Sequence, residues 1–189
     1  MNDCLAAYGQ LDCAVNSAGI SGPQSLLKDL ALEAFQEAVN TNLNGTFVCM
    51  KHELRAMVPA GRGAIVNLSS GAGWIGTPGL GAYCATKHAV LGLTKTAALE
   101  MARTGIRVNA LCPGATMTKF TTWRMHREDG TLDREAYDQF VERMRARSPL
   151  GEVGEAEDQA HILLHLASDA ARWTTGTIMR ANGGQTFSW

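Results

Sequence analysis

Three side chains between Ser70 and Lys87 have the chemistry and the spacing for proton transfer. Ser70 follows the short apolar run 64–68, which we predict to be a strand, and Tyr83 and Lys87 lie on a predicted helix. Because they are four residues apart, Tyr83 and Lys87 would share one helical face. A tyrosine normally titrates near pH ~10, but a neighbouring cation favours its phenolate. Tyr83 could then exchange a proton with a substrate oxygen that Ser70 binds. A surface Tyr–Lys pair with Ser70 as a turn cap has the same spacing.

Glycines in the same stretch imitate a phosphate-binding loop. Gly71, Gly73 and Gly76 spell G-x-G-x-x-G directly after the predicted strand. A dinucleotide fingerprint also needs a helix that begins at the loop and, usually, an acidic residue about twenty positions later. Here Pro78 follows the glycines, and Lys95 stands near the position of the acid. We therefore do not expect this loop to bind a pyrophosphate.

The elements that must position these residues alternate along the chain. Apolar periodicity and turn residues predict strands at 11–15, 64–68, 106–111 and 177–184, and helices at 32–58, 82–104, 137–144 and 155–168. Strands that alternate with helices indicate a parallel sheet with helices on both faces. We predict a single α/β domain over residues 1–189.

Composition narrows the classes of function. The net charge is -1 and 19% of residues are charged, so we expect no nucleic-acid partner. No apolar run reaches membrane-spanning length and the start does not resemble a signal peptide, which favours a soluble cytoplasmic protein. Five widely spaced cysteines fit neither a disulfide framework nor a C-x-x-C site. His161 and His165 lack a third ligand, so we expect no metal site.

Six motifs, in order across nearly the whole chain, resemble the short-chain dehydrogenase/reductase family. They are NSAG (16–19), NTNLNGTF (40–47), IVNLSS (65–70), YCATK (83–87), RVNALCPG (107–114) and TTGTIMRANGG (174–184). The resemblance implies a Rossmann-like, doubly wound parallel sheet. It also implies NAD(P)-dependent hydride transfer that interconverts a secondary alcohol and a ketone, without distinguishing NAD from NADP.

The resemblance also assigns roles to individual side chains. Tyr83 would be the catalytic acid/base, and Ser70 would orient the substrate oxygen; Ser69 is displaced by one position from the family spacing. Lys87 would bind the nicotinamide ribose and lower the pKa of Tyr83. Asn42 would anchor a water that links Lys87 to solvent. Since Asn42 falls on the apolar face of its helix, a hydrogen-bonded buried asparagine is the alternative.

Further residues match the family's cofactor site. With Tyr83 and Lys87, the cofactor-binding set would be Asn16, Ala18, Gly19, Pro113, Gly114, Thr116 and Thr118. Ser17 replaces a second asparagine of the family pattern and Asn182 replaces an aspartate. Both departures affect packing more than activity.

The largest departure from the family is at the start of the chain. Family members have a strand, a glycine-rich turn and further strand–helix units before the segment that begins here at Met1. At about thirty residues for each βαβ unit, roughly sixty or more residues are missing. We expect the strand at 11–15 to be left at an open sheet edge, and expect weak stability or assembly through that edge.

Two functions follow from this expectation. The sequence either derives from a working oxidoreductase or is a truncated, non-catalytic subunit that assembles with a complete paralogue. The resemblance implies a dimer or tetramer formed through the helices that hold Asn42 and Tyr83. The substrate would lie within 115–150, where Met117, Phe120, Trp123 and Met125 offer an apolar lining.

Overall fold

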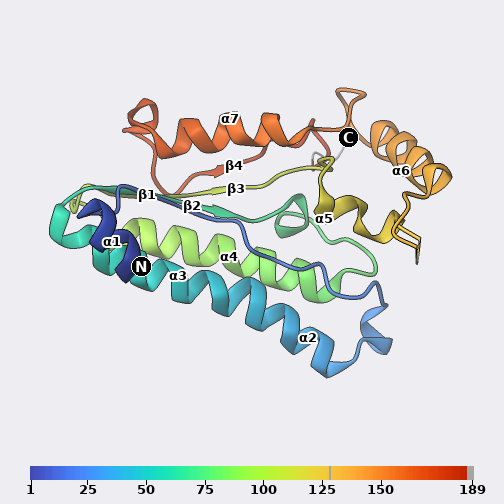
Figure 1. Ribbon diagram of the computed structural model, residues 1–189, viewed down its shortest axis with the longest axis horizontal. Helices are drawn as coiled ribbons and strands as arrows, with labels where there is room; N and C mark the ends of the chain where they lie inside the picture. The colour runs from blue at the N-terminus through green and yellow to red at the C-terminus, as the bar shows by residue number, and fades with distance from the viewer. Residues whose placement is uncertain (128, 187–189) are drawn as a thin grey trace.

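The computed structural model describes residues 1–127 and 129–186 and contains a four-stranded, fully parallel sheet (Figure 1). The strands lie side by side in chain order: β1 (Cys13–Asn16), β2 (Gly63–Leu68), β3 (Ile106–Leu111) and β4 (Ile178–Met179). The predicted parallel α/β sheet is therefore confirmed. The last strand is much shorter than the run 177–184 because the chain leaves the sheet after Met179.

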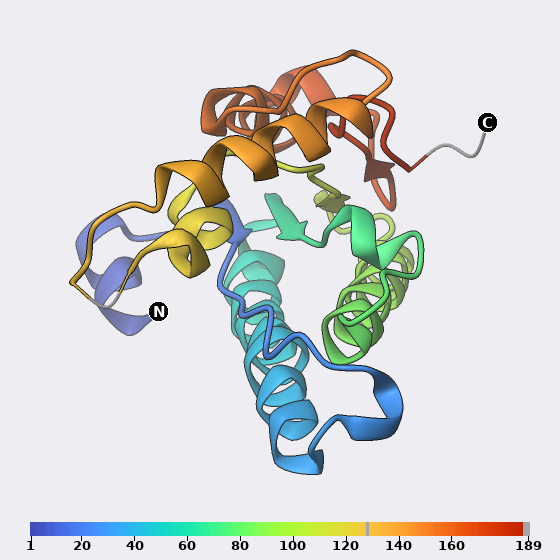
Figure 2. The same cartoon turned by 90° about the vertical axis from the view of Figure 1, so that its right-hand side faces the viewer.

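Helices cover both faces of the sheet, as the alternation of elements predicts. The helices are α1 (Asn2–Tyr8), α2 (Leu32–Ala38), α3 (Gly45–Met57), α4 (Gly81–Glu100), α5 (Lys119–Thr122), α6 (Arg134–Ala146) and α7 (Ala156–Ala167). Figure 1 shows α3 and α4 on one face and α7 on the other, and Figure 2 shows α6 beside α5. Among the described residues, no helix is long and apolar enough to cross a membrane.

The core lies on the two faces of β2. Successive strand residues point to opposite faces, so Ile65 packs against α3 and α4 with Met57, while Val66 packs towards α7 with Leu166. All four side chains are fully buried. A strand buried on both faces reads as a continuous apolar run, which is why 64–68 was recognisable in the sequence. This packing holds the carboxyl end of β2 in place.

The helix expected over 32–58 contains an irregularity that the sequence pattern does not reveal. Between α2 and α3 the chain forms a π-helix (Val39–Asn44). Asn42 lies in this segment and is completely buried, and its backbone carbonyl accepts a hydrogen bond of 2.8 Å from Thr46 Oγ1. π-Helical turns widen a helix by one residue and often occur at functional sites. Here the turn directs the amide of Asn42 into the interior.

β1 lies at one edge of the sheet. It pairs with β2 from Cys13↔Ala64 to Asn16↔Asn67 and has no strand on its other side among the described residues. Val15 is 45% exposed, which is unusual for an apolar residue in a parallel strand. The prediction of an exposed edge at this strand is confirmed. Such an edge offers unpaired backbone groups to another strand.

Candidate active site

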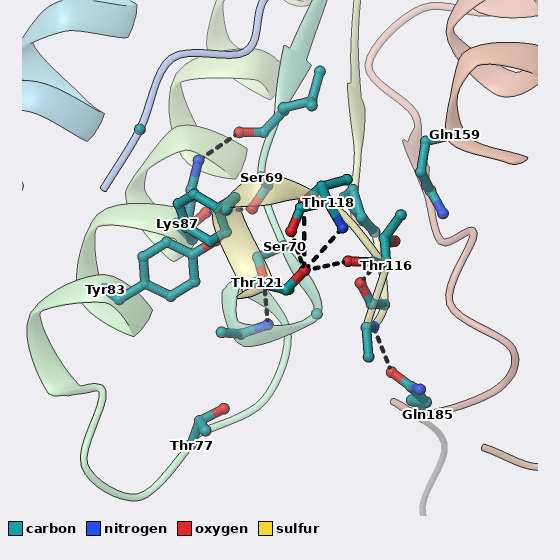
Figure 3. A pocket seen from close by; sticks show the side chains of 18 of the residues that line it. Ser69, Ser70, Thr77, Tyr83, Lys87, Thr116, Thr118, Thr121, Gln159 and Gln185 are labelled. Atoms are coloured by element: carbon teal, nitrogen blue, oxygen red, sulfur yellow. Dashed lines mark hydrogen bonds between the residues drawn. The ribbon is translucent and has the colours of Figure 1, made fainter. Parts of the chain in front are cut away.

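A cavity of about 630 Å³ opens at the carboxyl ends of β2 and β3. Ser70 lines it from the turn after β2, Tyr83 and Lys87 from α4, and Thr116 and Thr118 from the loop after β3 (Figure 3). Ligands of open parallel sheets bind at this end of the strands. The structure thus brings together three of the four predicted catalytic side chains.

Tyr83 and Lys87 are both buried against the end of β2. Tyr83 is 9% exposed and Lys87 is 4% exposed. Lys87 Nζ lies 5.7 Å from the centre of the Tyr83 ring and donates a hydrogen bond of 2.8 Å to the carbonyl of Leu68. The predicted helical face is confirmed, and the alternative of a solvent-exposed surface pair is wrong.

The electrostatics of this pair differ from the sequence expectation. Burial raises the pKa of Tyr83 above its usual value, and hydrogen bonding with Ser70 only partly opposes this rise. Burial also lowers the pKa of Lys87 from 10.5 to about 8. The expected lowering of the tyrosine pKa is therefore absent in this structure. Desolvation disfavours the phenolate of Tyr83 and the ammonium of Lys87. Tyr83 therefore keeps its proton, and Lys87 loses its proton at a lower pH than an exposed lysine does.

The two serines after β2 have different environments. Ser69 is buried and its Oγ donates a hydrogen bond of 2.8 Å to the backbone carbonyl of Lys87. Ser70 Oγ accepts a hydrogen bond of 3.1 Å from the N–H of Ala72 and lines the cavity beside Tyr83. Ser69 thus fixes α4 against β2. Ser70 is the serine whose hydroxyl hydrogen can still be donated to a ligand.

Among the glycines after β2, Gly73 is required by close packing, whereas Gly76 has open space around it. Gly71–Gly73 form a short 3-10 turn, and α4 begins only at Gly81, so no helix starts at Gly76. A Cβ on Gly73 would overlap Ser69 Oγ and lie 2.8 Å from the carbonyl oxygen of Lys87. A larger residue would therefore push the serine turn away from α4. The structure agrees with the expectation that this loop is not a pyrophosphate site.

Asn42 does not line the cavity but forms hydrogen bonds to Ile20 and Thr86, which are next to the lining residues Gly19 and Lys87 in the chain. Its Oδ1 accepts a hydrogen bond from Ile20 N–H, and its Nδ2 donates to the Ile20 carbonyl and to Thr86 Oγ1. A Cβ on Gly19 would lie 3.2 Å from Asn42 Oδ1 and 3.4 Å from Lys87 Nζ. The alternative of a buried asparagine with satisfied hydrogen bonds therefore describes its side chain. Asn42 holds the turn at Gly19 against Lys87.

The predicted cofactor residues divide into two groups. Gly19, Pro113, Gly114, Thr116 and Thr118 line the cavity, together with Tyr83 and Lys87. Asn16 and Ala18 do not line it, whereas Ser17 between them does.

Asn16 points into the protein. Its Nδ2 donates to Glu53 Oε2 at 3.0 Å and to Asn67 Oδ1 at 2.9 Å. The side-chain amide of Asn16 is thus engaged by a buried carboxylate and a buried amide, and the place of Asn16 in the turn that passes the cofactor stays a prediction. Burial raises the pKa of Glu53 above its usual value, and the hydrogen bond from Asn16 partly counteracts this.

The loop after β3 is held by several hydrogen bonds. The N–H of Gly114 donates to the Ala181 carbonyl, and the N–H of Ala115 donates to Gln185 Oε1. Thr118 and Thr121 form a reciprocal capping box at the start of α5. These bonds give the two lining threonines a fixed backbone.

The far wall of the cavity was predicted only in part, since Arg147 lies within the expected range 115–150 whereas Gln159, Gln185 and Thr186 were missed. Arg147, Gln159, Gln185 and Thr186 line it, from the end of α6, from α7 and from the segment after β4. For Gln185 and Thr186, the only signal in the sequence was their position directly after ANGG, the end of the last family motif.

The expected apolar lining is present only in part. Phe120 lines the cavity, and Trp123 borders an adjoining pocket of about 400 Å³ that also contains Phe120. Met117 and Met125 line neither cavity. In the parts of the chain that the structure describes, no group of three or more His, Cys, Asp or Glu residues could hold a metal ion.

The fold and the cavity together define an oxidoreductase of the Rossmann-like class, and comparison with known proteins identifies the family. A family model described as enoyl-(acyl carrier protein) reductase matches residues 1–186. The chain belongs to the short-chain dehydrogenase/reductase family.

Two curated relatives illustrate the range of similar enzymes. The chain is 41% identical over 183 residues to 2,5-dichloro-2,5-cyclohexadiene-1,4-diol dehydrogenase of Sphingobium indicum, covering 96% of this chain and 70% of the relative. It is also 41% identical over 189 residues to 3beta-hydroxysteroid dehydrogenase of Mediterraneibacter gnavus, covering 95% of this chain and 68% of the relative. Both relatives are named as dehydrogenases of cyclic alcohols.

Solved structures agree with the fold. Levodione reductase superimposes with a TM-score of 0.90 at 32% identity, covering 100% of this chain and 71% of that one. ElxO with NADP bound superimposes with a TM-score of 0.88 at 35% identity, covering 97% of this chain and 71% of ElxO. The Rossmann-like architecture is thus shared over essentially the whole chain.

Proposed function

We propose that this protein interconverts a secondary alcohol and a ketone by NAD(P)-dependent hydride transfer. The observation that carries the proposal is the convergence of Tyr83, Ser70 and Lys87 on one cavity at the carboxyl end of the sheet. The names of the similar enzymes, which act on cyclic diols, steroids and diketones, support a medium-sized or cyclic substrate. A cavity of about 630 Å³ is within the usual range for such ligands.

In the proposed mechanism, Tyr83 transfers the proton and Ser70 holds the reacting oxygen. In ketone reduction, the carbonyl carbon gains a hydride while the phenol of Tyr83 gives its proton to the carbonyl oxygen. Ser70 donates a hydrogen bond to the same oxygen as negative charge develops on it. The raised pKa of Tyr83 keeps its proton in place at neutral pH, which suits the reductive direction. Oxidation requires the deprotonated phenol and is favoured at higher pH.

The cofactor would be NAD or NADP, whose nicotinamide supplies or accepts the hydride when bound. We assign its nicotinamide end to Gly19, Lys87, Pro113, Gly114, Thr116 and Thr118. These residues fit because they share one wall of the cavity and offer hydroxyl and amine groups. At Gly19 even a Cβ would lie 3.4 Å from Lys87 Nζ, so a glycine keeps that amine accessible. Bound NADP in the similar ElxO supports this assignment.

We further propose that the pyrophosphate is bound outside residues 1–189, by a glycine-rich turn that follows a strand paired with β1. Two observations support this part of the proposal. β1 is an edge strand with an exposed Val15. The chain also spans about 70% of the length of the relatives that it matches.

The same exposed edge favours a second candidate function. A non-catalytic subunit would use β1 to assemble with a complete paralogue, and its cavity would be left unused. Homo-oligomers through α3 and α4 are also part of our proposal, because Phe47, Val48 and Leu99 are exposed there. Cofactor binding separates the candidates, since a non-catalytic subunit has no need for affinity towards NAD or NADP.

The test is the cofactor-dependent oxidation of secondary alcohols by the purified chain and by Tyr83→Phe. We expect Tyr83→Phe to lower kcat by about 10²–10⁴-fold, because the acid/base is removed, with little change in the cofactor Kd. Tyr8→Phe is the matched control, since Tyr8 is 80% exposed and outside the cavity. Unchanged activity of Tyr83→Phe would remove Tyr83 from its role. Tight binding of NAD or NADP by the chain would overturn the non-catalytic subunit, because such a subunit has no need for that affinity.

A further inference from the structure

The charge of the cavity lining differs from that of the whole protein. The chain has a net charge of -1. Among the described residues, the cavity lining contains three cationic side chains, Lys87, Lys119 and Arg147, and no aspartate or glutamate. A cleft lined by one sign of charge concentrates ligands of the opposite sign. The lining therefore favours a negatively charged ligand.

Lys119 and Arg147 differ from Lys87 in their position. Lys87 is buried and bound to the Leu68 carbonyl next to Tyr83, whereas Lys119 and Arg147 are exposed at the rim. Neither rim cation takes part in a salt bridge within the described residues. Both can therefore reach a ligand group that lies away from the reacting carbon.

The backbones that carry the two rim cations are fixed. Lys119 is the first residue of α5, whose start is held by the capping box of Thr118 and Thr121. Arg147 follows α6 and precedes the buried Ser148, whose Oγ donates to the Gly183 carbonyl at 3.3 Å.

Two acidic residues at the start of α7 form hydrogen bonds to their own helix. Ala156 lines the cavity at the start of α7, and the flanking Glu155 and Asp158 cap that helix reciprocally. The Asp158 carboxylate accepts the N–H of Glu155 at 2.8 Å, and the Glu155 carboxylate accepts a backbone N–H of the first turn. These carboxylates are hydrogen-bonded to the helix and are not cavity-lining groups.

We propose that Lys119 and Arg147 are specificity-determining residues that select an alcohol or ketone bearing a carboxylate or another anionic group on the side opposite the reacting carbon. This inference rests on the proposed function, since it names the substrate class of the same site. An exposed cation contributes at most about fivefold to the binding of an anion, so both together favour the anionic substrate by up to about 25-fold.

The test compares 4-hydroxycyclohexane-1-carboxylate with its neutral primary amide as substrates of the full chain. We expect kcat/KM to favour the carboxylate, and the preference to weaken with added salt. Lys119→Gln and Arg147→Gln should each reduce the preference by raising KM for the carboxylate, with kcat unchanged. Lys119→Glu should abolish or reverse the preference for the carboxylate over the amide. Lys95→Gln, which removes an exposed lysine outside the cavity, is the matched control.

Lys119 and Arg147 could instead bind the phosphates of the cofactor. The cofactor Kd of the variants distinguishes this role from binding of an anionic substrate. A raised cofactor Kd in the variants, with unchanged discrimination between carboxylate and amide, would overturn the proposal. Equal kcat/KM for carboxylate and amide would also overturn it while leaving the oxidoreductase function intact. If no substrate is turned over, calorimetric titration of the two compounds still decides: a preference for the carboxylate that is lost in the variants supports the proposal, and equal or absent binding overturns it.

Discussion

The side-chain amide of Asn42 forms hydrogen bonds with both the backbone N–H and the backbone carbonyl of Ile20. Asn42 Oδ1 accepts the Ile20 N–H at 2.8 Å, and Nδ2 donates to the Ile20 carbonyl at 2.9 Å. Nδ2 also donates to Thr86 Oγ1 at 3.1 Å. One buried side chain therefore holds the turn after β1 against α4, the helix that carries Tyr83 and Lys87.

Asn42→Ala should destabilise the protein and weaken cofactor binding. The substitution leaves the partly buried backbone groups of Ile20 and the buried hydroxyl of Thr86 without this partner, so we expect the free energy of unfolding to fall by about 2–4 kcal/mol. Denaturant unfolding measures this loss, and the cofactor KM should rise because Gly19 is no longer fixed. Asn44→Ala is the control, since its amide bonds only to the exposed Asn40. Equal effects of the two substitutions would contradict this role.

The two serines after β2 should respond differently to substitution. Ser70→Ala should lower kcat by about 10²-fold, because a hydrogen bond to the developing oxyanion is lost, and should cost some stability through the lost hydrogen bond from Ala72 N–H. Ser69→Ala should lower the free energy of unfolding by about 1 kcal/mol, because its bond to the Lys87 carbonyl is lost. Steady-state kinetics and thermal unfolding of both variants test this. The reverse pattern would mean that Ser69 is the catalytic serine.

Lys87 should make the protein more stable as the pH rises from about 8 to 10. Burial lowers its folded-state pKa to about 8, so in this range the unfolded chain holds a proton that the folded protein has lost. The free energy of unfolding should therefore increase with pH by up to about 3 kcal/mol. Unfolding at fixed pH values measures the slope. Lys87→Met should flatten it, and an equal slope in that variant would assign the effect to other groups.

Glu53 should have the opposite effect at acidic pH. Its folded-state pKa is raised by burial, so the folded protein binds a proton more tightly than the unfolded chain, and ionised Glu53 costs stability. Glu53→Gln keeps an acceptor for Asn16 and removes the charge. We expect it to be more stable than the wild type at neutral pH, with the difference closing as the pH falls towards 4.5. Glu100→Gln is the matched control, because Glu100 lies at the exposed end of α4.

Local rules indicated the cluster of Ser70, Tyr83 and Lys87. The spacing of Tyr83 and Lys87 defines one helical face, and the apolar run before Ser70 defines a buried strand whose end carries the serine. Both rules act within a few residues. They indicated that the three side chains could meet, whereas the choice of Ser70 over Ser69 and the rejection of a surface pair depended on the family motifs along the rest of the chain.

Properties that depend on distant neighbours were not predictable in this way. The pKa of Tyr83 was expected to fall, but it rises because the packing around it excludes water. Asn16 points to Glu53, 37 residues away in the sequence, and no local pattern reveals that pairing. The far wall with Gln159 and Gln185 is assembled from α7 and the segment after β4, so its residues meet only in the folded protein.

The π-helix at Val39–Asn44 makes the site sensitive to chain length as well as to composition. Each residue of a regular helix turns the chain by about 100°, so the extra residue sets the phase of α3 relative to α2. Deleting one amino acid here would let a regular helix form through the junction without removing Asn42 itself. The side-chain amide of Asn42 would rotate by more than a quarter of a turn about the helix axis. A single-residue deletion would therefore remove the hydrogen bonds of Asn42 although Asn42 itself is still present.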